Sequence, residues 1–282
     1  MAVVIVVIAV VLGTLAAPAD QATRPVATRQ AITGALAVTR QPVKLLLLGD
    51  SIALTLGAGL GDHSATRYGV NEINKGTLGC ELDDLPVELS GSVGPATPGC
   101  LNWRALWRQD IRRYRPDVVG LLIGRWEVSN HLYRGHWVHI GEPAWDAHLE
   151  SELLTAIQIL SAGGAKIVLF TMPYVDPPNK AADGLPFPEN DPSRAAAFNH
   201  LLYVFAAHHR SQVLVINLNK MIDPDGHFQM AIDGKVVRWT DGVHITIVAG
   251  LWLQSRILPT VKALGLEAQS SVLAKAKRLG AD

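Results

Sequence analysis

Two short motifs near opposite ends of the chain carry residue types that could act together in acyl transfer. Near the start, an apolar run ends at Gly49-Asp50-Ser51, and near the end Asp241 precedes His244 by three residues. A serine hydroxyl becomes a nucleophile when a histidine takes its proton and a carboxylate orients that histidine. We therefore expect Ser51 to be the nucleophile, His244 the base and Asp241 the residue that orients the base.

Each motif alone also has an ordinary structural explanation, since Gly-Asp-Ser is a common turn and aspartate often caps a helix. The surrounding elements make the pair more specific. Residues 43–48 predict a strand buried on both faces. Ser51 then stands at a strand-to-helix junction, and residues 247–258, just after His244, have helical apolar spacing. Open α/β folds bind ligands at the carboxyl edge of the sheet, where the amides that open a helix favour an anion.

Predicted strands and helices alternate along the rest of the chain. The further strands are expected at residues 68–74, 118–123, 166–172 and 213–217, and the further helices at 101–114, 145–162 and 194–209. A hairpin is expected at 228–238 and a terminal helix at 270–279. The alternation predicts a three-layer α/β/α sandwich with a doubly wound, mostly parallel five-stranded sheet.

These motifs resemble those of the SGNH (GDSL-like) hydrolases, and more narrowly the extracytoplasmic SGNH domains attached to actinobacterial membrane acyltransferases. The resemblance covers roughly residues 43–264 and depends on four blocks: Leu48-Gly49-Asp50-Ser51, Gly79-Cys80, Leu121-Leu122-Ile123-Gly124-Arg125-Trp126-Glu127 and Asp241-Gly242-Val243-His244. It implies a flavodoxin-like strand order of 2-1-3-4-5. The Gly-x-Ser-x-Gly elbow of other serine hydrolases is absent around Ser51.

The resemblance also implies roles for residues around the serine. The backbone amides of Ser51 and Gly79 would hold the oxyanion, with Gly76 as the alternative to Gly79. The family's third block is usually Gly-x-Asn-Asp, whose asparagine amide helps to bind the oxyanion. Here the block contains Arg125 and Trp126 instead, so that amide is missing. We assign both residues to substrate binding.

Two segments are predicted as long loops. Residues 128–143 are polar and aromatic-rich, which indicates a substrate-facing rim or a plain surface loop. No metal site and no cofactor are predicted, because no carboxylate lies at ligand spacing from the loop's histidines, His131, His136 and His139. Residues 175–193 are rich in proline, aspartate and asparagine, and a loop of this length is typical of a lid or a binding segment.

The chain has two cysteines, Cys80 and Cys100, on either side of a segment rich in proline, glycine and serine. A disulfide between them would close a loop of about twenty residues and stabilise the fold by roughly 3 kcal/mol. The alternatives are two unpaired thiols or a metal pair, but no nearby cysteine or histidine completes a zinc set. We favour the disulfide.

Composition and the N-terminus indicate export. The chain has 25 basic and 25 acidic residues and no basic stripe, which argues against nucleic-acid binding. Residues 1–15 are almost wholly apolar, and Ala17-Pro18-Ala19 resembles a cleavage site, so the start is a signal peptide, an uncleaved anchor or the last helix of a longer acyltransferase. The predicted units are a signal or membrane anchor (1–19), a flexible linker (20–41), a catalytic domain (42–266) and a C-terminal tail (267–282).

The sequence thus predicts an exported, serine-dependent esterase or O-acyltransferase that works through an acyl-serine. The resemblance favours acetyl-type esters of cell-envelope or secreted glycans as substrates and a membrane acyltransferase as partner. Two other functions remain open. The altered third block and the tryptophans Trp126, Trp137 and Trp145 would suit a non-catalytic glycan-binding module. A secreted lipase would need an apolar channel for the acyl chain.

Overall fold

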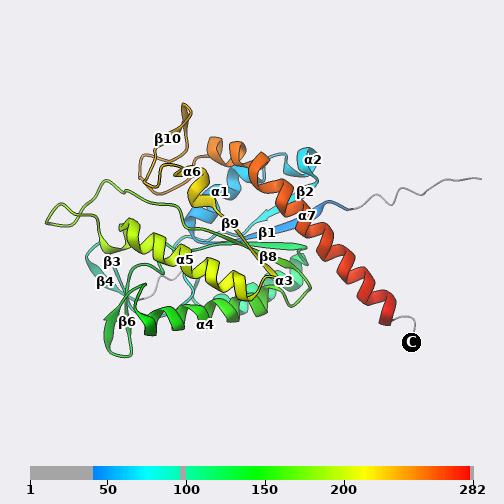
Figure 1. Ribbon diagram of the computed structural model, residues 1–282, viewed down its shortest axis with the longest axis horizontal. Coiled ribbons are helices and arrows are strands. Elements are labelled where there is room, and N and C mark those ends of the chain that lie inside the picture. Colours follow the sequence, from blue (N-terminus) through cyan, green and yellow to red (C-terminus); the bar gives the residue numbers. More distant parts are fainter. Residues whose placement is uncertain (1–40, 96–99, 280–282) are drawn as a thin grey trace, which may run out of the picture. The chain divides into compact units, whose positions relative to one another are not determined.

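The centre of the protein is a sheet of five parallel strands. A computed structural model describes residues 41–95 and 100–279, so the predicted signal or anchor and nearly all of the predicted linker lie outside the described residues. The sheet has the order β2-β1-β5-β8-β9 (Figure 1). The strands are β1 (Val43–Gly49), β2 (Val70–Asn74), β5 (Val118–Leu122), β8 (Lys166–Phe170) and β9 (Val213–Ile216). The expected order of 2-1-3-4-5 is confirmed.

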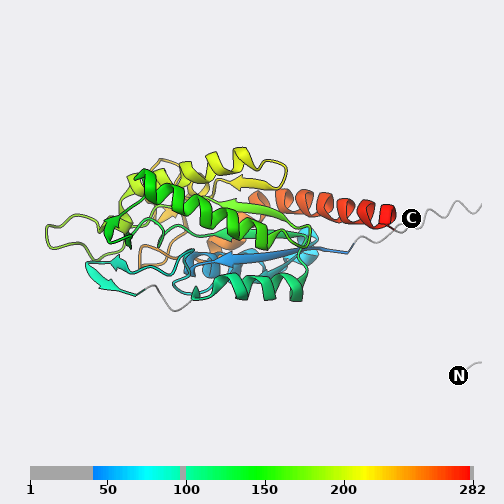
Figure 2. The ribbon, with the colours of Figure 1, turned by 90° about the horizontal axis from the view of Figure 1, so that it is seen from below.

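Helices cover both faces of this sheet and confirm the three-layer sandwich (Figures 1 and 2). One face carries α1 (Ser51–Leu60) and α7 (Ile247–Leu279). The other carries α3 (Trp103–Tyr114), α4 (Pro143–Leu160) and α5 (Pro192–His208). Two short helices, α2 (Ser64–Tyr68) and α6 (Leu218–Ile222), lie in connections. Because both faces are covered, Leu45, Leu46, Leu47 and Leu48 of β1 are all buried. The burial of each leucine contributes about 2 kcal/mol to folding.

The two helices on the first face touch through their backbones. A Cβ atom at Gly59 of α1 would lie 2.3 Å from the carbonyl oxygen of Ile247 and 2.8 Å from the Cα of Gly250 in α7. Only glycine fits so close a crossing. Gln254 of α7 adds hydrogen bonds from its amide to the carbonyl oxygens of Gly59 (3.1 Å) and Asp62 (2.6 Å) at the end of α1. The helix that begins at Ser51 and the helix that follows His244 are therefore held closely together.

A second, antiparallel sheet corrects the prediction of a loop at residues 128–143. It has the order β4-β3-β6-β7 and consists of β3 (Val87–Leu89), β4 (Ser92–Gly94), β6 (Asn130–Tyr133) and β7 (His136–Val138). The β6–β7 turn contains Arg134 and Gly135, both with positive φ, as a tight hairpin requires. Pairing of β6 with β3, about forty residues earlier, supplies the support that the local sequence pattern does not show.

Several predicted boundaries shift. The strand expected from Tyr68 begins at Val70, because Tyr68 ends α2 and Gly69 caps that helix in the left-handed region. Helix α7 joins the two helices expected at 247–258 and 270–279, and it passes through the expected domain boundary after residue 266. The predicted hairpin is confirmed as β10 (Ala231–Ile232) and β11 (Lys235–Val236). Among the described residues, no helix combines the length and the apolar character that a membrane span needs.

Candidate active site

Ser51 is the first residue of α1, at the point where β1 ends. Gly49 has a φ of +133°, and a Cβ atom there would overlap the carbonyl oxygen of Leu122 on the neighbouring strand, so the turn requires glycine. The Asp50 carboxylate caps the helix by accepting hydrogen bonds from the amides of Ile52 (2.7 Å) and Ala53 (3.3 Å). The cap does not use the Ser51 amide. This amide is therefore a candidate donor to an anion at the helix terminus.

Asp241 and His244 lie side by side in the loop before α7. Asp241 Oδ2 is 2.7 Å from His244 Nδ1, while Oδ1 accepts hydrogen bonds from the amides of Val243 (2.9 Å) and His244 (3.0 Å). One carboxylate thus fixes both the loop and the ring. His244 Nε2 is buried and has no hydrogen-bond partner among the described residues. With Nδ1 donating to Asp241, Nε2 carries the free lone pair that a general base needs.

Thr55, which the sequence reading did not single out, connects the serine turn to the histidine loop. Its hydroxyl donates to the carbonyl oxygen of Ser51 (3.1 Å) or Ile52 (3.2 Å) in the turn before it. The same oxygen accepts a hydrogen bond from the amide of Ile245 (3.3 Å). A threonine inside a helix is too common a residue to signal such a contact. The bridge places the two loops that carry Ser51 and His244 against each other.

The charges around Ser51 influence one another. Burial raises the pKa of Asp50 to about 6, although the hydrogen bonds from Ile52 and Ala53 and the charges of Arg125 and His244 lower it. Burial of Asp241 alone would raise its pKa too. The hydrogen bonds from His244 and the loop amides outweigh that effect, so the pKa of Asp241 lies below its ordinary value. Asp241 therefore stays ionised beside the imidazole at neutral pH.

Arg125 and Trp126 lie at the same edge of the sheet, after β5. Burial lowers the pKa of the Arg125 guanidinium, while the charges of Asp50, Glu189 and Asp241 raise it. The guanidinium also lies over the Trp126 ring, with Cζ 5.8 Å from the ring centroid. Arg125 Nε and Trp126 Nε1 are buried and lack hydrogen-bond partners among the described residues. These two donors are therefore not satisfied by any group of the described protein.

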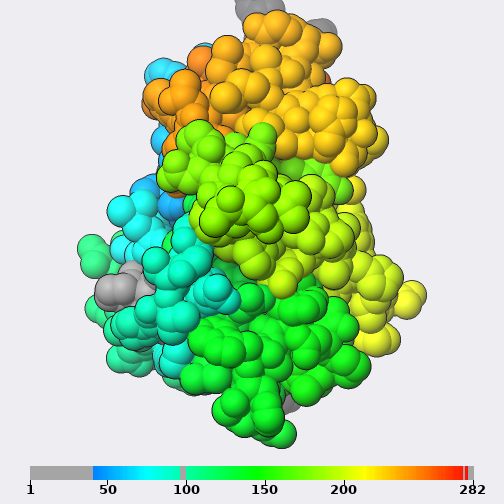
Figure 3. Space-filling model, turned by 90° about the vertical axis from the view of Figure 1, so that its left-hand side faces the viewer, coloured from blue at the N-terminus to red at the C-terminus, as the bar shows by residue number. Residues whose placement is uncertain are grey.

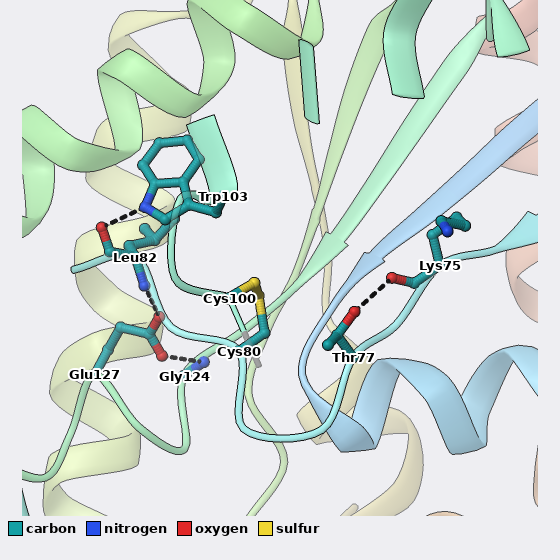
Figure 4. Close-up of a disulfide and its surroundings, with 8 residues drawn as sticks. All are labelled: Lys75, Thr77, Cys80, Leu82, Cys100, Trp103, Gly124 and Glu127. Carbon is teal, nitrogen blue, oxygen red and sulfur yellow. Dashed lines mark hydrogen bonds between the residues drawn. A yellow bond between two sulfur atoms is a disulfide. The ribbon is translucent and has the colours of Figure 1, made fainter. Parts of the chain in front are cut away.

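Glu127, the last residue of the third block, has a structural task that the sequence did not reveal. It is fully buried, and its two oxygens accept hydrogen bonds from the amides of Gly124 (2.8 Å) and Leu82 (3.1 Å) (Figure 4). The carbonyl oxygen of Leu82 accepts another from Trp103 Nε1 (2.9 Å). Burial raises the pKa of Glu127 well above its ordinary value. The third block is thereby fastened to the segment that follows Gly79.

The Gly79 segment is held from two sides. A disulfide joins Cys80 to Cys100, with their Cα atoms 4.6 Å apart, and confirms the predicted pairing (Figure 4). The amide of Thr77 donates to the carbonyl oxygen of Gly49 (2.9 Å), which places this segment beside the serine turn. Gly79 lies between these two anchors and is partly exposed.

The long loop predicted at 175–193 crosses the carboxyl edge of the sheet. At one end, the amide of Asp176 donates to the carbonyl oxygen of Gly242 in the histidine loop (2.9 Å). Near the other end, in the 3-10 helix Pro188–Asn190, Glu189 Oε1 accepts hydrogen bonds from the amide (2.7 Å) and hydroxyl (3.0 Å) of Ser90. Figure 3 shows this yellow-green segment between the orange segment that follows β9 and the cyan and green segments of the second sheet. Helix α5 then begins at Pro192, so the loop is slightly shorter than predicted.

The predicted aromatic rim is only partly on the surface. Trp145 is fully buried and stacks on His131, with ring centroids 4.5 Å apart, so neither ring can face a substrate. Trp137 is 43% exposed, and Trp126 is partly buried. We expected no carboxylate at ligand spacing from the histidines of this segment, but Glu142 Oε1 lies 3.6 Å from His139 Nε2, and Glu81 Oε2, from a distant part of the sequence, lies 3.5 Å from His131 Nε2.

Comparison with known proteins supplies a family and a fold. The family described as "SGNH domain (fused to AT3 domains)" matches residues 20–259. No curated protein matches the chain. Among solved structures, the aryl esterase of M. smegmatis has a TM-score of 0.55 and 13% identity, over 79% of this chain and 99% of that one. Est24, a carbohydrate acetylesterase from Sinorhizobium meliloti, has a TM-score of 0.51 and 13% identity over the same shares. A GDSL-like lipase from Bacteroides thetaiotaomicron has a TM-score of 0.50 and 14% identity, over 79% and 92%.

Proposed function

The chain belongs to the family of SGNH domains that are fused to AT3 domains, and from this premise we propose that it cleaves or transfers acyl esters through an acyl-serine at Ser51. The observation that carries the proposal is the pairing of Asp241 Oδ2 with His244 Nδ1 at 2.7 Å, which leaves a buried Nε2 without a partner. The Thr55 bridge between the serine turn and the histidine loop supports it.

In the proposed reaction, Ser51 Oγ bonds to the ester carbon as its proton passes to His244 Nε2. The carbonyl oxygen becomes an oxyanion, which the amides of Ser51 and Gly79 stabilise. The bond to the alcohol oxygen then breaks, and His244 returns the proton to that oxygen. Asp241 holds the imidazole in the required tautomer and stabilises its positive charge. Water or a sugar hydroxyl attacks the acyl-serine by the same steps in reverse, which gives hydrolysis or O-acyl transfer.

We propose acetyl-type esters of an extracytoplasmic glycan as the substrate. One structural neighbour is described as a carbohydrate acetylesterase, which makes acetylated carbohydrate the first substrate to test. Arg125 Nε and Trp126 Nε1 are unpartnered donors that suit sugar hydroxyls or the acyl oxygen. Export is supported by the Cys80–Cys100 disulfide, because such bridges persist in oxidising compartments. The proposed partner is a membrane acyltransferase, since the family is fused to AT3 domains.

A glycan-binding module without catalysis is the second candidate, and the altered third block favours it. The missing asparagine is replaced by Trp126, an aromatic residue that can stack on a sugar ring. Trp145 no longer supports this function, because it is buried in the core. Asp241 pairs with Nδ1 of His244 and leaves Nε2 without a partner, which is the arrangement of a general base, so we place catalysis first.

The deciding experiment exposes the protein to a fluorophosphonate probe and to p-nitrophenyl acetate. We expect the probe on the Ser51 peptide, and we expect Ser51→Ala to lower ester cleavage by about 10⁴-fold or more. Ser151→Ala, an exposed serine on α4, is the matched control and should keep both labelling and cleavage. If the parent is not labelled, or if Ser51→Ala retains more than a few per cent of the activity, the catalytic assignment fails. If Ser51 is labelled and required, rates on esters of increasing acyl chain length separate an acetylesterase from a lipase.

A further inference from the structure

A buried group of three potential metal ligands lies outside the residues assigned to catalysis. Glu81 is 2% exposed, Asp83 5% and His131 0%. His131 Nε2 is 3.5 Å from Glu81 Oε2 and 3.9 Å from Asp83 Oδ2. One ligand atom from each of the three residues lies within 4.8 Å of the others. Within the described parts of the chain, no other group of three histidine, cysteine or acidic residues meets this spacing.

The contacts around the group leave acceptor atoms of His131 and of the two carboxylates facing its centre. His131 Nδ1 lies 3.1 Å from the carbonyl oxygen of Ser129, which can only accept, so Nδ1 carries the proton. In the neutral ring, Nε2 then presents a lone pair to two carboxylates. Asp83 Oδ1 is held by the amide of Leu85 (2.9 Å), but its Oδ2 is buried and has no hydrogen-bond partner among the described residues. Facing acceptors repel one another unless a cation lies between them.

A third buried acid, Glu127, lies next to the group, because its Oε1 accepts a hydrogen bond from the amide of Leu82, the residue between the two acidic ligands (3.1 Å). Its two oxygens are already used by backbone amides, so it is a neighbour of the group and not a ligand. Burial of several carboxylates beside one imidazole is costly without a compensating charge. A bound cation supplies that charge.

We propose that Glu81, Asp83 and His131 bind one divalent transition-metal cation, with Zn²⁺ the preferred ion. Zinc bonds of 2.0 to 2.2 Å at tetrahedral angles place ligand atoms about 3.3 to 3.6 Å apart. The distances of 3.5 and 3.9 Å need a contraction of only a few tenths of an ångström. An imidazole nitrogen with two carboxylate oxygens suits Zn²⁺ or Mn²⁺ better than Mg²⁺ or Ca²⁺, which prefer oxygen alone. The bond from Nδ1 to a backbone carbonyl is the usual support of a metal-binding histidine.

The ion would be structural. Two ligands come from the segment after Cys80 and the third from β6, so the metal would fasten the Gly79–Cys80 segment to the second sheet. It takes no part in the ester chemistry proposed for Ser51. The site was not evident from the sequence, because about fifty residues separate His131 from the two carboxylates.

The test uses the untagged full chain, stripped with a chelator, reloaded with Zn²⁺ and desalted. We expect one zinc per chain by mass spectrometry, a melting temperature several degrees higher than that of the stripped protein, and visible absorption bands after loading with Co²⁺. Asp83→Asn, which is nearly isosteric, and His131→Gln should each lose the stoichiometric zinc and the bands. Asp84→Asn and His136→Gln, exposed neighbours of the same types, should retain both.

Two results would overturn the proposal. A wild-type chain that binds neither Zn²⁺ nor Mn²⁺ and melts at the same temperature with and without them would show that protons alone stabilise the group. Zinc retained at one per chain in Asp83→Asn and in Glu81→Gln would place the metal elsewhere. Both readouts come from the wild-type chain or the near-isosteric variants, so a His131→Gln chain that fails to fold does not affect the outcome.

Discussion

The two halves of the candidate site are held in place by different kinds of contact. The nucleophile–base half consists of Ser51, Asp241 and His244, and its hydrogen bonds span only two or three residues, apart from the Thr55 bridge. The third-block half consists of residues 124–127 and residues 80–83, which meet through Glu127. The first half depends on two local turns, a buried one at Ser51 and a partly exposed one at Asp241 and His244, and the second half depends on a buried carboxylate that joins distant segments. We therefore expect changes in the first half to alter rate and changes in the second to alter stability first.

Among the changes that test this difference between the halves, the largest effect is expected for Asp241→Asn. The amide keeps an oxygen for the loop amides but presents an NH₂ group to His244 Nδ1, which favours the wrong imidazole tautomer. Ester cleavage should fall by about 10³- to 10⁴-fold, while the free energy of unfolding changes by less than about 1 kcal/mol. Rates on p-nitrophenyl acetate and urea denaturation measure the two quantities. Asp225→Asn, an exposed residue of the same region, is the control. A large loss of stability would remove the distinction between the halves.

Glu127→Ala tests the other half. It leaves the buried amides of Leu82 and Gly124 without an acceptor, so the free energy of unfolding should fall by about 2 to 4 kcal/mol. Glu127→Gln retains one acceptor oxygen and should lose about half as much. Urea denaturation gives both values, and Glu150→Ala, at an exposed position of α4, serves as the control. Equal stabilities for the parent and Glu127→Ala would show that the carboxylate does not hold the two segments together.

A change at Glu72, a largely buried carboxylate beside α1, tests whether stability and rate are independent in the nucleophile–base half. Burial raises the pKa of Glu72 from 4.5 to about 8. The native chain then keeps a proton that the unfolded chain releases, so stability falls as pH rises from about 4.5 to about 8. Glu72→Gln resembles the protonated form and should raise the free energy of unfolding by about 2 kcal/mol at pH 8 and by little at pH 4. Denaturation curves at both pH values are compared with those of Glu267→Gln, an exposed control.

The Glu72→Gln variant should leave ester cleavage unchanged. A fall in rate would mean that stability and rate are coupled in the nucleophile–base half as well. A pH slope equal to the parent's would contradict the raised pKa itself.

The smallest effect is expected for Trp126→Asn. The missing side-chain donor of the third block is returned, and the rate on a small acetyl ester should rise by about tenfold, less than the 10² to 10³ that a fully placed donor provides. Arg125→Ala should lower the rate if its guanidinium partly replaces that donor. Trp137→Asn, on the exposed β7, is the control. A loss of activity in Trp126→Asn, with Arg125→Ala neutral, would assign Trp126 to the substrate platform or the core.

The difference between local and long-range contacts also decides which features the sequence could predict. The parallel sheet, its order and the pairing of Asp241 with His244 follow from patterns that lie within a few residues or from block resemblance. Glu127 and Leu82 are 45 residues apart, His131 and Glu81 are 50 apart, and Thr55 and Ile245 are 190 apart. A pattern within a few residues cannot predict contacts between residues so far apart in the sequence. For this reason the local sequence pattern indicates a surface rim at His131, although the residue is buried against Trp145.

The glycine contact between α1 and α7 has a mechanical consequence. With Gly59 against Gly250, the two backbones have no side chains between them that could repack and let the helices slide. We therefore expect the proposed nucleophile, at the start of α1, and the proposed base, just before α7, to move together as one rigid unit. We expect any movement that widens the candidate site to occur in residues 175–191, which bridge the histidine loop and the second sheet. Such a movement would leave Ser51 and His244 in the same positions relative to each other.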